Sequence, residues 1–305
     1  MWEFLIPLFA ATVQSGTPLI YATLGEIMTE RGGVLNLGVE GIMSISALVA
    51  FWISFTTGSP WLGFLGAGLA GMVFASLHAF VCISCLGNQV VSGLALTIFG
   101  VGLTHYLGVP YVGLHAPGFT PFDFPLLSQI PVLGDVFFKH DMLVYLSFVV
   151  PFLFWFFFKR TSLGLHVVAT GEMPAAAAAA GLRPIALRYF AVVSGGFLIG
   201  LGGAYLSLAY THLWTNGLSG GRGWIAVALV IFAFWRPGRA VAGAYLFGGV
   251  MAFQLRLQAM GTHLPSSLLL MLPYILTILV LILSACFGRR IEAPAALGTN
   301  IEPEG

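Results

Sequence analysis

Blocks of apolar residues, each followed by a short polar or glycine- and proline-containing segment, make up most of the chain. Each block is about 20 residues long, the length that an α-helix needs to cross the hydrocarbon core of a bilayer. The pattern predicts nine transmembrane helices and therefore an all-α polytopic membrane protein. We place them near residues 4–24, 37–56, 61–85, 89–108, 142–158, 187–209, 223–235, 240–258 and 266–287.

The seventh of these segments, residues 223–235, is short for a complete crossing. Gly-Arg-Gly at 221–223 precedes it and Arg-Pro-Gly-Arg at 236–239 follows it, so it is either a spanning helix or the half-helix of a re-entrant segment. The longest weakly apolar interval, residues 109–141, contains five prolines and is predicted to be an external loop rather than a domain.

Composition supports a membrane protein, because 58% of the residues are hydrophobic and 8% are charged, whereas ordinary soluble domains are about 25% charged. The net charge of +1 and the lack of a basic stripe exclude nucleic-acid binding. Three cysteines are too few for a disulfide-stapled secreted domain. Residues 1–3 carry no positive charge, so the first apolar block is predicted to be a retained spanning helix and not a signal peptide.

Lysine and arginine residues are divided unevenly between the two sides of the predicted bundle, which orients it because cytoplasmic loops carry the excess. One side collects nine of the 12 and the other side three. The more positive side consists of residues 25–36, 86–88, 159–186, 236–239 and 288–305, with Arg188 at the adjoining helix end. This division puts the N-terminus outside, and the loop 159–186 and the C-terminus in the cytoplasm.

Three of the 11 acidic residues, Glu26, Glu30 and Glu40, lie at the junction of the first and second predicted helices, with Arg31 and Asn36 beside them. On a helix, Glu26 and Glu30 would share a face, and like charges at that spacing repel each other. The segment is either a solvated cytoplasmic turn or a broken-helix element that lines an aqueous cavity. The second interpretation predicts a function, because ionisable residues inside a membrane bundle are costly.

A second polar segment contains Gly171, Glu172 and Pro174, continues with six alanines and ends at Gly181. Pro174 suits the first turn of a helix, Glu172 lies near the positive end of that helix, and Gly181 suits the position after its last turn. The pattern predicts a short cytoplasmic helix around Ala177, whose small side chains let another surface approach closely. The alternative is a helical linker between two halves of the bundle.

Other polar residues in the apolar blocks give weaker signals. Cys82 and Cys85 form a CxxC in an apolar helix without further ligands, so packing is favoured and no metal site is predicted. His78 and His105 lie inside predicted spans without a carboxylate spaced to pair with them, which argues against a proton relay.

Asn88 and Gln89 stand at the start of a predicted helix, where they either cap it or contact a polar solute. No GxxxxGK[ST], GxSxG or HExxH pattern occurs in the chain. The sequence therefore predicts neither a nucleotide site of its own nor an intramembrane hydrolase, and we expect the chain not to be an enzyme.

Residues 24–41, LGEIMTERGGVLNLGVEG, closely resemble the signature of bacterial ABC-importer permeases for nucleosides and simple sugars. These permeases belong to the wider group that includes ribose-type and branched-chain amino-acid permeases. The segment from Gly171 to Gly181 is similar to the family's cytoplasmic coupling helix, which docks on the ATPase, except that alanines replace its usual polar residues. Residues 219–237 resemble the family's next motif. The similarity extends over about residues 18–287, and three motifs in the right order make it specific.

The resemblance implies a type II-like importer permease bundle with two related halves. It implies as partners a second homologous permease, ABC ATPase subunits, an external substrate-binding lipoprotein and membrane lipid. ATP would be used by the ATPase, and this chain would bind no cofactor. The expected location is the bacterial plasma (inner) membrane, with residues 1–290 as a single transmembrane domain and 291–305 as a disordered cytoplasmic tail.

The function implied by the resemblance is ATP-driven import of a nucleoside or simple-sugar-like solute by alternating access, in which the partner ATPase moves the helix at 171–182. The alternative is a secondary transporter driven by an ion gradient, which the position of the acidic residues at span ends disfavours. The solute stays open: a purine or other nucleoside, a ribose-like sugar and a vitamin with a ribityl chain all fit. Residues expected at the translocation path or in its supporting wall are Glu26, Glu30, Asn36, Glu40, Asn88 and Gln89.

Overall fold

The computed structural model describes residues 2–261, 265–287 and 293–299. In this part of the chain, seven helices are long and apolar enough to cross a membrane. They are α1 (Trp2–Arg31), α2 (Val39–Thr57), α3 (Pro60–Ala79), α4 (Gln89–Gly108), α6 (Met142–Arg160), α9 (Pro184–Tyr205) and α11 (Pro237–Ala259). Two of them, α3 and α9, continue into the π-helical turns η1 (Phe80–Ser84) and η4 (Leu206–Tyr210).

Two further apolar segments complete the bundle, α10 (Arg222–Ala233) and α13 (Leu272–Phe287), the latter preceded by the short helix α12 (Ser266–Leu270). Every predicted span thus coincides with helical structure, and the all-α polytopic fold class is confirmed. The largest boundary error concerns the first helix, which was expected to end near residue 24 and continues to Arg31. It continues because the bundle supplies partners for the carboxyl groups of Glu26 and Glu30.

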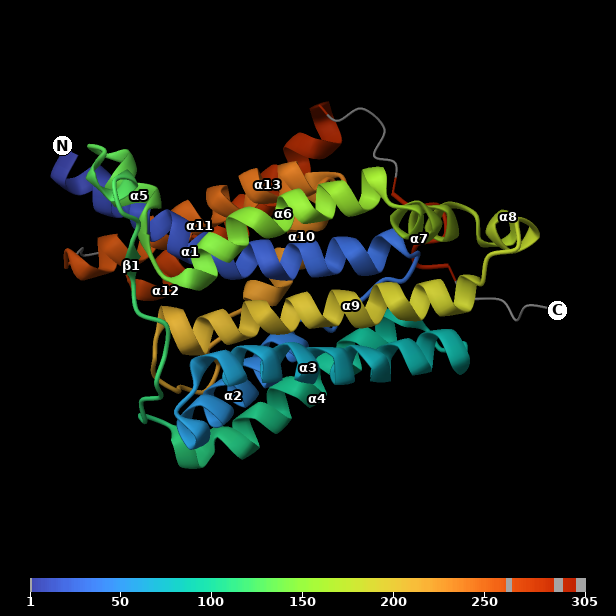
Figure 1. Ribbon diagram of the computed structural model, residues 1–305, viewed down its shortest axis with the longest axis horizontal. Coiled ribbons are helices and arrows are strands. Elements are labelled where there is room, and N and C mark those ends of the chain that lie inside the picture. Colours follow the sequence, from blue (N-terminus) through green and yellow to red (C-terminus); the bar gives the residue numbers. More distant parts are fainter. Residues whose placement is uncertain (1, 262–264, 288–292, 300–305) are drawn as a thin grey trace.

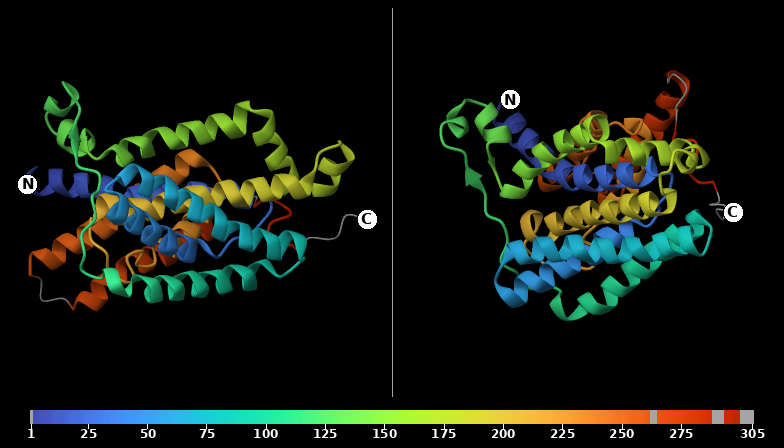
Figure 2. Two further views of the ribbon diagram at one scale, coloured as in Figure 1. Left: turned by 60° about the horizontal axis from the view of Figure 1, so that its bottom comes forward. Right: turned by 45° about the vertical axis from the view of Figure 1, so that its right-hand side comes forward.

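The two ends of the bundle carry different connecting segments (Figure 1). Residues 109–141 cover the end at which α1 begins, and β1 pairs there with β2 in antiparallel register. The opposite end carries α7 and α8, and α8 projects beyond the long helices in Figure 1 and in the left view of Figure 2. The short elements are η2 (Val109–Tyr111), β1 (Phe122–Asp123), η3 (Leu127–Gln129), α5 (Leu133–Phe137), β2 (Lys139–His140), α7 (Ser162–Glu172) and α8 (Pro174–Ala179).

Helix α1 runs through the middle of the bundle and packs on both α9 and α11. Glycines permit the close approach: a Cβ added to Gly25 of α1 or to Gly195 of α9 would lie 2.5 Å from the carbonyl oxygen of the other residue. On α11, a Cβ at Gly248 would lie 2.6 Å from the backbone nitrogen of Gly16. Lipid provides no hydrophobic drive between helices, so backbone contacts of this kind hold membrane bundles together.

The crossing that contains α10 is half loop and half helix. Residues 211–221 start at the end covered by residues 109–141, where the Gly113 N–H donates to the Trp214 carbonyl over 2.9 Å. The 12-residue helix α10 then covers about 18 Å, against about 30 Å for the hydrocarbon core. It ends beside Arg31, at the α7 end of the bundle. The predicted short segment is therefore the half-helix of a broken crossing.

Candidate functional site

The four polar residues predicted between the first two helices are all buried, with exposed fractions of 0% for Glu26, 2% for Glu30, 0% for Asn36 and 6% for Glu40. Helix α1 ends at Arg31, α2 begins at Val39, and the non-helical residues between them are enclosed by the bundle. The interpretation as a solvated turn is therefore wrong, and the segment is a broken-helix element. Backbone of this kind is tolerated at membrane depth where protein encloses it.

Glu26 and Asn36 hold this break together. The Asn36 backbone N–H donates to Glu26 Oε1 over 3.2 Å, and Asn36 Oδ1 accepts from the Gly38 N–H over 2.9 Å. Within the described residues, Glu26 Oε2 and Asn36 Nδ2 are buried without a hydrogen-bond partner.

Glu40 binds the N-terminus of the half-helix α10. Its Oε1 accepts from the Gly221 N–H at 2.9 Å and from Ser219 Oγ at 2.6 Å, and its Oε2 accepts from the Gly223 N–H at 2.7 Å. A carboxylate is stabilised there, because the first N–H groups of a helix are unpaired and its dipole is positive at that end. Gly223 allows the approach, since a Cβ on it would lie 2.5 Å from the Glu40 backbone.

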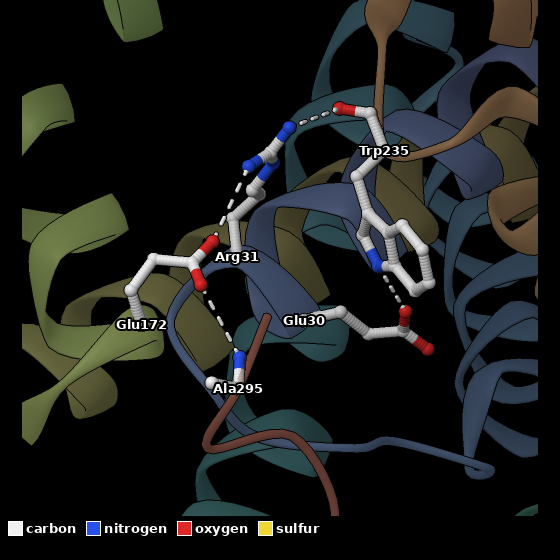
Figure 3. A network of polar contacts seen from close by, with 5 residues as sticks. All are labelled: Glu30, Arg31, Glu172, Trp235 and Ala295. Carbon is white, nitrogen blue, oxygen red and sulfur yellow. Dashed lines mark hydrogen bonds and ion pairs between the residues drawn. The ribbon is translucent and has the colours of Figure 1, made fainter. Parts of the chain in front are cut away.

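The C-terminus of α10 is held by the end of α1 (Figure 3). Trp235 Nε1 donates to Glu30 Oε2 over 2.5 Å, and Arg31 Nη2 donates to the Trp235 carbonyl over 3.3 Å. Phe234 and Trp235 have φ angles of 53° and 54°, a left-handed conformation that terminates the helix sharply. Glu30 and Arg31 therefore fix the position at which the half-helix ends.

Arg31 also connects α1 to the segment predicted as the coupling helix. Its Nη1 lies 3.9 Å from Glu172 Oε1, and the Ala295 N–H donates to Glu172 Oε2 over 3.3 Å (Figure 3). Gly171 packs directly on α1, because a Cβ on it would overlap the Arg31 carbonyl oxygen. Through Arg31, the end of α7 is thus connected to the end of α1 and to the C-terminus of α10.

The short alanine helix is present, but its N-terminal neighbour differs from the prediction. Helix α8 starts at Pro174, and Gly181, with a φ of 82°, ends it, as expected. Glu172, however, is the last residue of α7, an 11-residue helix that the sequence did not reveal. Its charge pairs with Arg31, and because Glu172 directly precedes Met173, the N-cap of α8, it also lies near the positive end of that helix, as expected. Ala177 is 4% exposed, because α8 turns this alanine toward the protein and its neighbours outward.

Asn88 and Gln89 have structural partners. Asn88 caps α4, since its Oδ1 accepts from the Val91 N–H at 3.0 Å, which is the capping alternative of the two interpretations. Gln89 accepts from the Leu35 N–H at 2.7 Å and donates to the Thr299 carbonyl at 2.8 Å. It therefore ties the start of α4 both to the break between α1 and α2 and to the C-terminal segment.

Residues 293–299 pack against the bundle, which differs from the disordered tail expected for them. The Ala296 N–H donates to the Gly171 carbonyl over 2.9 Å, and Ala296 is 8% exposed. The rest of the predicted tail, 291–292 and 300–305, lies outside the described residues, as do Arg289 and Arg290 of the charge count.

Sequence reasoning missed the partners of the acidic residues. Trp235, Ser219 and Ser44 were not singled out, although Trp235 and Ser219 fall within the motif at 219–237. Arg222 donates to the Leu218 and Ser219 carbonyl oxygens and stacks 5.4 Å from the centre of the Tyr210 ring. The motif was the only signal for Trp235 and Ser219, because their partners Glu30 and Glu40 lie far away in the sequence.

His78 and Cys82 are neighbours inside the bundle. His78 is buried, with Nδ1 at 2.9 Å from Ser92 Oγ and Nε2 at 3.0 Å from the Leu35 carbonyl oxygen. Cys82 lies within 4 Å of the same ring. Across residues 2–261, 265–287 and 293–299, no group of three or more His, Cys, Asp or Glu side chains is arranged to hold a metal ion.

Comparison with known proteins places this architecture in a family. Residues 8–281 match the family described as the permease component of the branched-chain amino acid transport system. The chain belongs to this permease family. No solved structure matches the chain.

Several curated relatives align with the permease over most of its length. It is 47% identical to the putative glucose ABC transporter permease of Haloferax volcanii, covering 86% of this chain and 81% of the relative. It is 35% identical to the nucleoside ABC transporter permease of Lactococcus lactis, covering 93% of both chains. It is 34% identical to the guanosine ABC transporter permease of Bacillus subtilis, covering 94% of both chains.

The permease is therefore a membrane subunit of an ABC transporter, and it is a multi-pass membrane protein. It is a transport subunit and not an enzyme, since in this family ATP is hydrolysed by a separate ATPase subunit. Family membership implies ATPase and substrate-binding partners. The resemblance inferred from the motifs is confirmed, and the comparisons give no support to a secondary transporter.

Proposed function

We propose that the permease imports a neutral nucleoside or simple sugar by alternating access. The names of three relatives, which specify glucose, a nucleoside and guanosine as their solutes, support this class. The broken crossing supports it too, because transporters commonly place their solute path where discontinuous helices meet near the bilayer midplane. The acidic residues Glu26, Glu30 and Glu40 bind backbone and side-chain donors of the chain itself, so we assign them to the wall of the path.

The end that carries α7 and α8 faces the cytoplasm in this proposal, and the chain lies in the plasma membrane with its N-terminus outside. The support is the positive-inside rule. Lys159 and Arg160 end α6 there, Arg183 precedes α9, and Arg236 and Arg239 flank the start of α11. Residues 109–141 then cover the outer end, where an external substrate-binding lipoprotein would dock.

The α7–α8 segment is the site on which the ATPase acts. Gly171, Glu172, Pro174, Ala177 and Gly181 shape it, and the alanines flanking Ala177 leave an outer face with little side-chain bulk. Because Gly171 lies against the Arg31 carbonyl, a displacement of α7 must move either the end of α1 or the contact between them. A second homologous permease would complete the solute path, and the ATPase would displace the α7–α8 segment of each permease.

Helix α10 is the element that transmits this displacement. Its C-terminus is bonded to Arg31 and Glu30, and its N-terminus is bonded to Glu40 of α2. The single observation that carries the proposal is the continuous chain of contacts from Glu172 through Arg31 to Trp235 (Figure 3). For ATP to drive transport, the ATPase must hold this chain differently in its open and closed states, because a ligand shifts an equilibrium only by its differential affinity.

Reconstitution tests the proposal. The permease, its second permease, the ATPase and the lipoprotein are placed in proteoliposomes, and uptake of labelled guanosine and glucose is measured with ATP, with ADP and with an ion gradient alone. Uptake of one of these solutes that requires ATP supports the proposal. Accumulation by the permease alone on an ion gradient, without any effect of ATP, would contradict it.

A further inference from the structure

A cavity with a largely apolar lining and several polar side chains lies where the broken crossing changes from loop to half-helix. Its volume is about 260 Å³, and it opens between α2, α4 and residues 214–221. The side chains that give it its chemistry are Glu40, Ser44, Thr104, His105, Trp214 and Ser219. Helix α10 covers about 18 Å from here to the α7 end of the bundle.

The hydroxyl groups of the lining side chains Ser44, Thr104 and Ser219 all donate their protons to acceptors within the protein. Ser219 Oγ donates to Glu40 Oε1 over 2.6 Å, so in the 2.9 Å contact between the two serines Ser44 is the donor. Thr104 donates to the Gly100 carbonyl over 2.6 Å. A hydroxyl has one proton and two acceptor lone pairs. Ser44 and Thr104 therefore present acceptors to the cavity and have no proton left to donate.

The backbone donors at the start of α10 are used as well. The N–H groups of Gly221 and Gly223 donate to the Glu40 carboxylate, and the Gly220 N–H donates to the Gly217 carbonyl over 3.0 Å. An unoccupied helix N-terminus binds anions, but here a side chain of the protein occupies that position. The negative charge of Glu40 also disfavours a second carboxylate beside it.

Two further lining side chains carry donors. His105 offers both a donor and an acceptor in its neutral form. Trp214 is 1% exposed, and within the described residues its Nε1–H is buried without a hydrogen-bond partner. Arg222 is not among the lining residues: its Nη1 donates to the Leu218 and Ser219 carbonyl oxygens, and its guanidinium stacks on the Tyr210 ring.

We propose that this cavity is a solute subsite that accepts hydrogen bonds from the hydroxyl groups of a neutral solute and excludes solutes that carry a carboxylate. The inference rests on the proposed function and adds its selectivity. Amino acids, which the family description names as cargo, are disfavoured. The Glu40 carboxylate already occupies the N-terminus of α10, where the carboxylate of an amino acid would otherwise bind. The volume is just below the roughly 300–1,000 Å³ of typical ligand sites, so it suits a sugar-sized group.

A double-mutant cycle between protein and solute tests the subsite. Ser44→Ala and Thr104→Val each remove one acceptor with little change of shape. Ser147→Ala is the matched control, since Ser147 makes the same kind of bond to the Val144 carbonyl in α6. Binding of guanosine, of glucose and of their single-hydroxyl deoxy derivatives to the purified permease–ATPase complex, without the lipoprotein, is measured by saturation-transfer NMR.

Loss of one acceptor should weaken binding of the parent solute about fivefold. One deoxy derivative should bind the variant as well as it binds the wild type, because its missing hydroxyl was the donor. Equal binding by Ser44→Ala, Thr104→Val and Ser147→Ala would overturn the subsite, and so would leucine binding as tight as that of the parent solute. Failure of the proposed function is distinguished by uptake: the wild-type transporter would then import neither guanosine nor glucose with ATP.

Discussion

Removing the charge of Glu172 should uncouple ATP hydrolysis from transport while leaving the fold intact. Glu172→Gln keeps the size of the side chain and removes its attraction to Arg31. The two charged groups are 3.9 Å apart, and their side chains are 24% exposed for Arg31 and 47% for Glu172. Solvent screening limits the contribution of a partly exposed ion pair to stability to about 0.2–1 kcal/mol, so the apparent Tm should change by no more than about 2 °C.

The same energy matters more for coupling than for stability. If Glu172 biases α1 and α7 to move together by about 1 kcal/mol, its loss changes the balance between coupled and uncoupled states about fivefold. We therefore expect the number of solute molecules imported per ATP hydrolysed to fall severalfold, while hydrolysis itself persists. The assay measures uptake and phosphate release in the same proteoliposomes.

A matched control exists at the other end of the molecule. Lys139 Nζ lies 2.6 Å from Asp135 Oδ1, and both side chains are similarly exposed, at 44% and 45%. Asp135→Asn breaks an ion pair between α5 and β2, at the end of the bundle opposite to α7, and it should leave the ratio of solute to ATP unchanged. A Glu172→Gln transporter with the ratio of Asp135→Asn would refute the reasoning. Arg31→Gln should lower the ratio further, because it also removes the bond to the Trp235 carbonyl.

Two other predictions concern the packing of the α7 end. Gly171→Ala places a Cβ against the Arg31 carbonyl oxygen and should lower the free energy of unfolding by about 1–3 kcal/mol, which is measured as a lower Tm. Gly102→Ala is the control, because nothing lies within 4 Å of its Cβ position. An equal Tm in both variants would contradict the close contact. Deleting residues 293–305 removes the bonds to Gly171, Glu172 and Gln89 and should speed hydrogen exchange at the end of α7; unchanged exchange would show that the tail does not hold it.

The hydrophobic pattern predicted the helices well, because length and apolar character are what a bilayer demands of a span. It also identified the short crossing at α10, where glycines and a proline interrupt the apolar run. The end of α1 was misplaced for the opposite reason. Glu26 and Glu30 look like loop residues in the sequence, and only the folded bundle supplies the Asn36 N–H and the Trp235 indole that let them stay in a helix.

The candidate site could be recognised in outline but not assembled. The motifs contained Glu30, Glu40 and their partners but did not show which residues pair. Those partners lie far along the chain: Trp235 is 205 residues from Glu30, and Gly223 is 183 residues from Glu40. Pairing over such separations follows from how α10 enters the bundle, which local spacing does not encode.

The central claim, that the ATPase acts on α8, is tested most directly by cross-linking in native membranes. Ala178→Cys is better placed than Ala177, because Ala178 is exposed and Ala177 is buried; the natural cysteines are first replaced, since Cys85 is exposed. Gln129→Cys, in the exposed η3 segment at the opposite end, is the control. We predict a cross-link from Ala178→Cys to the ATPase and none from Gln129→Cys. An ATPase that is captured from position 129, or never from position 178, would contradict the account.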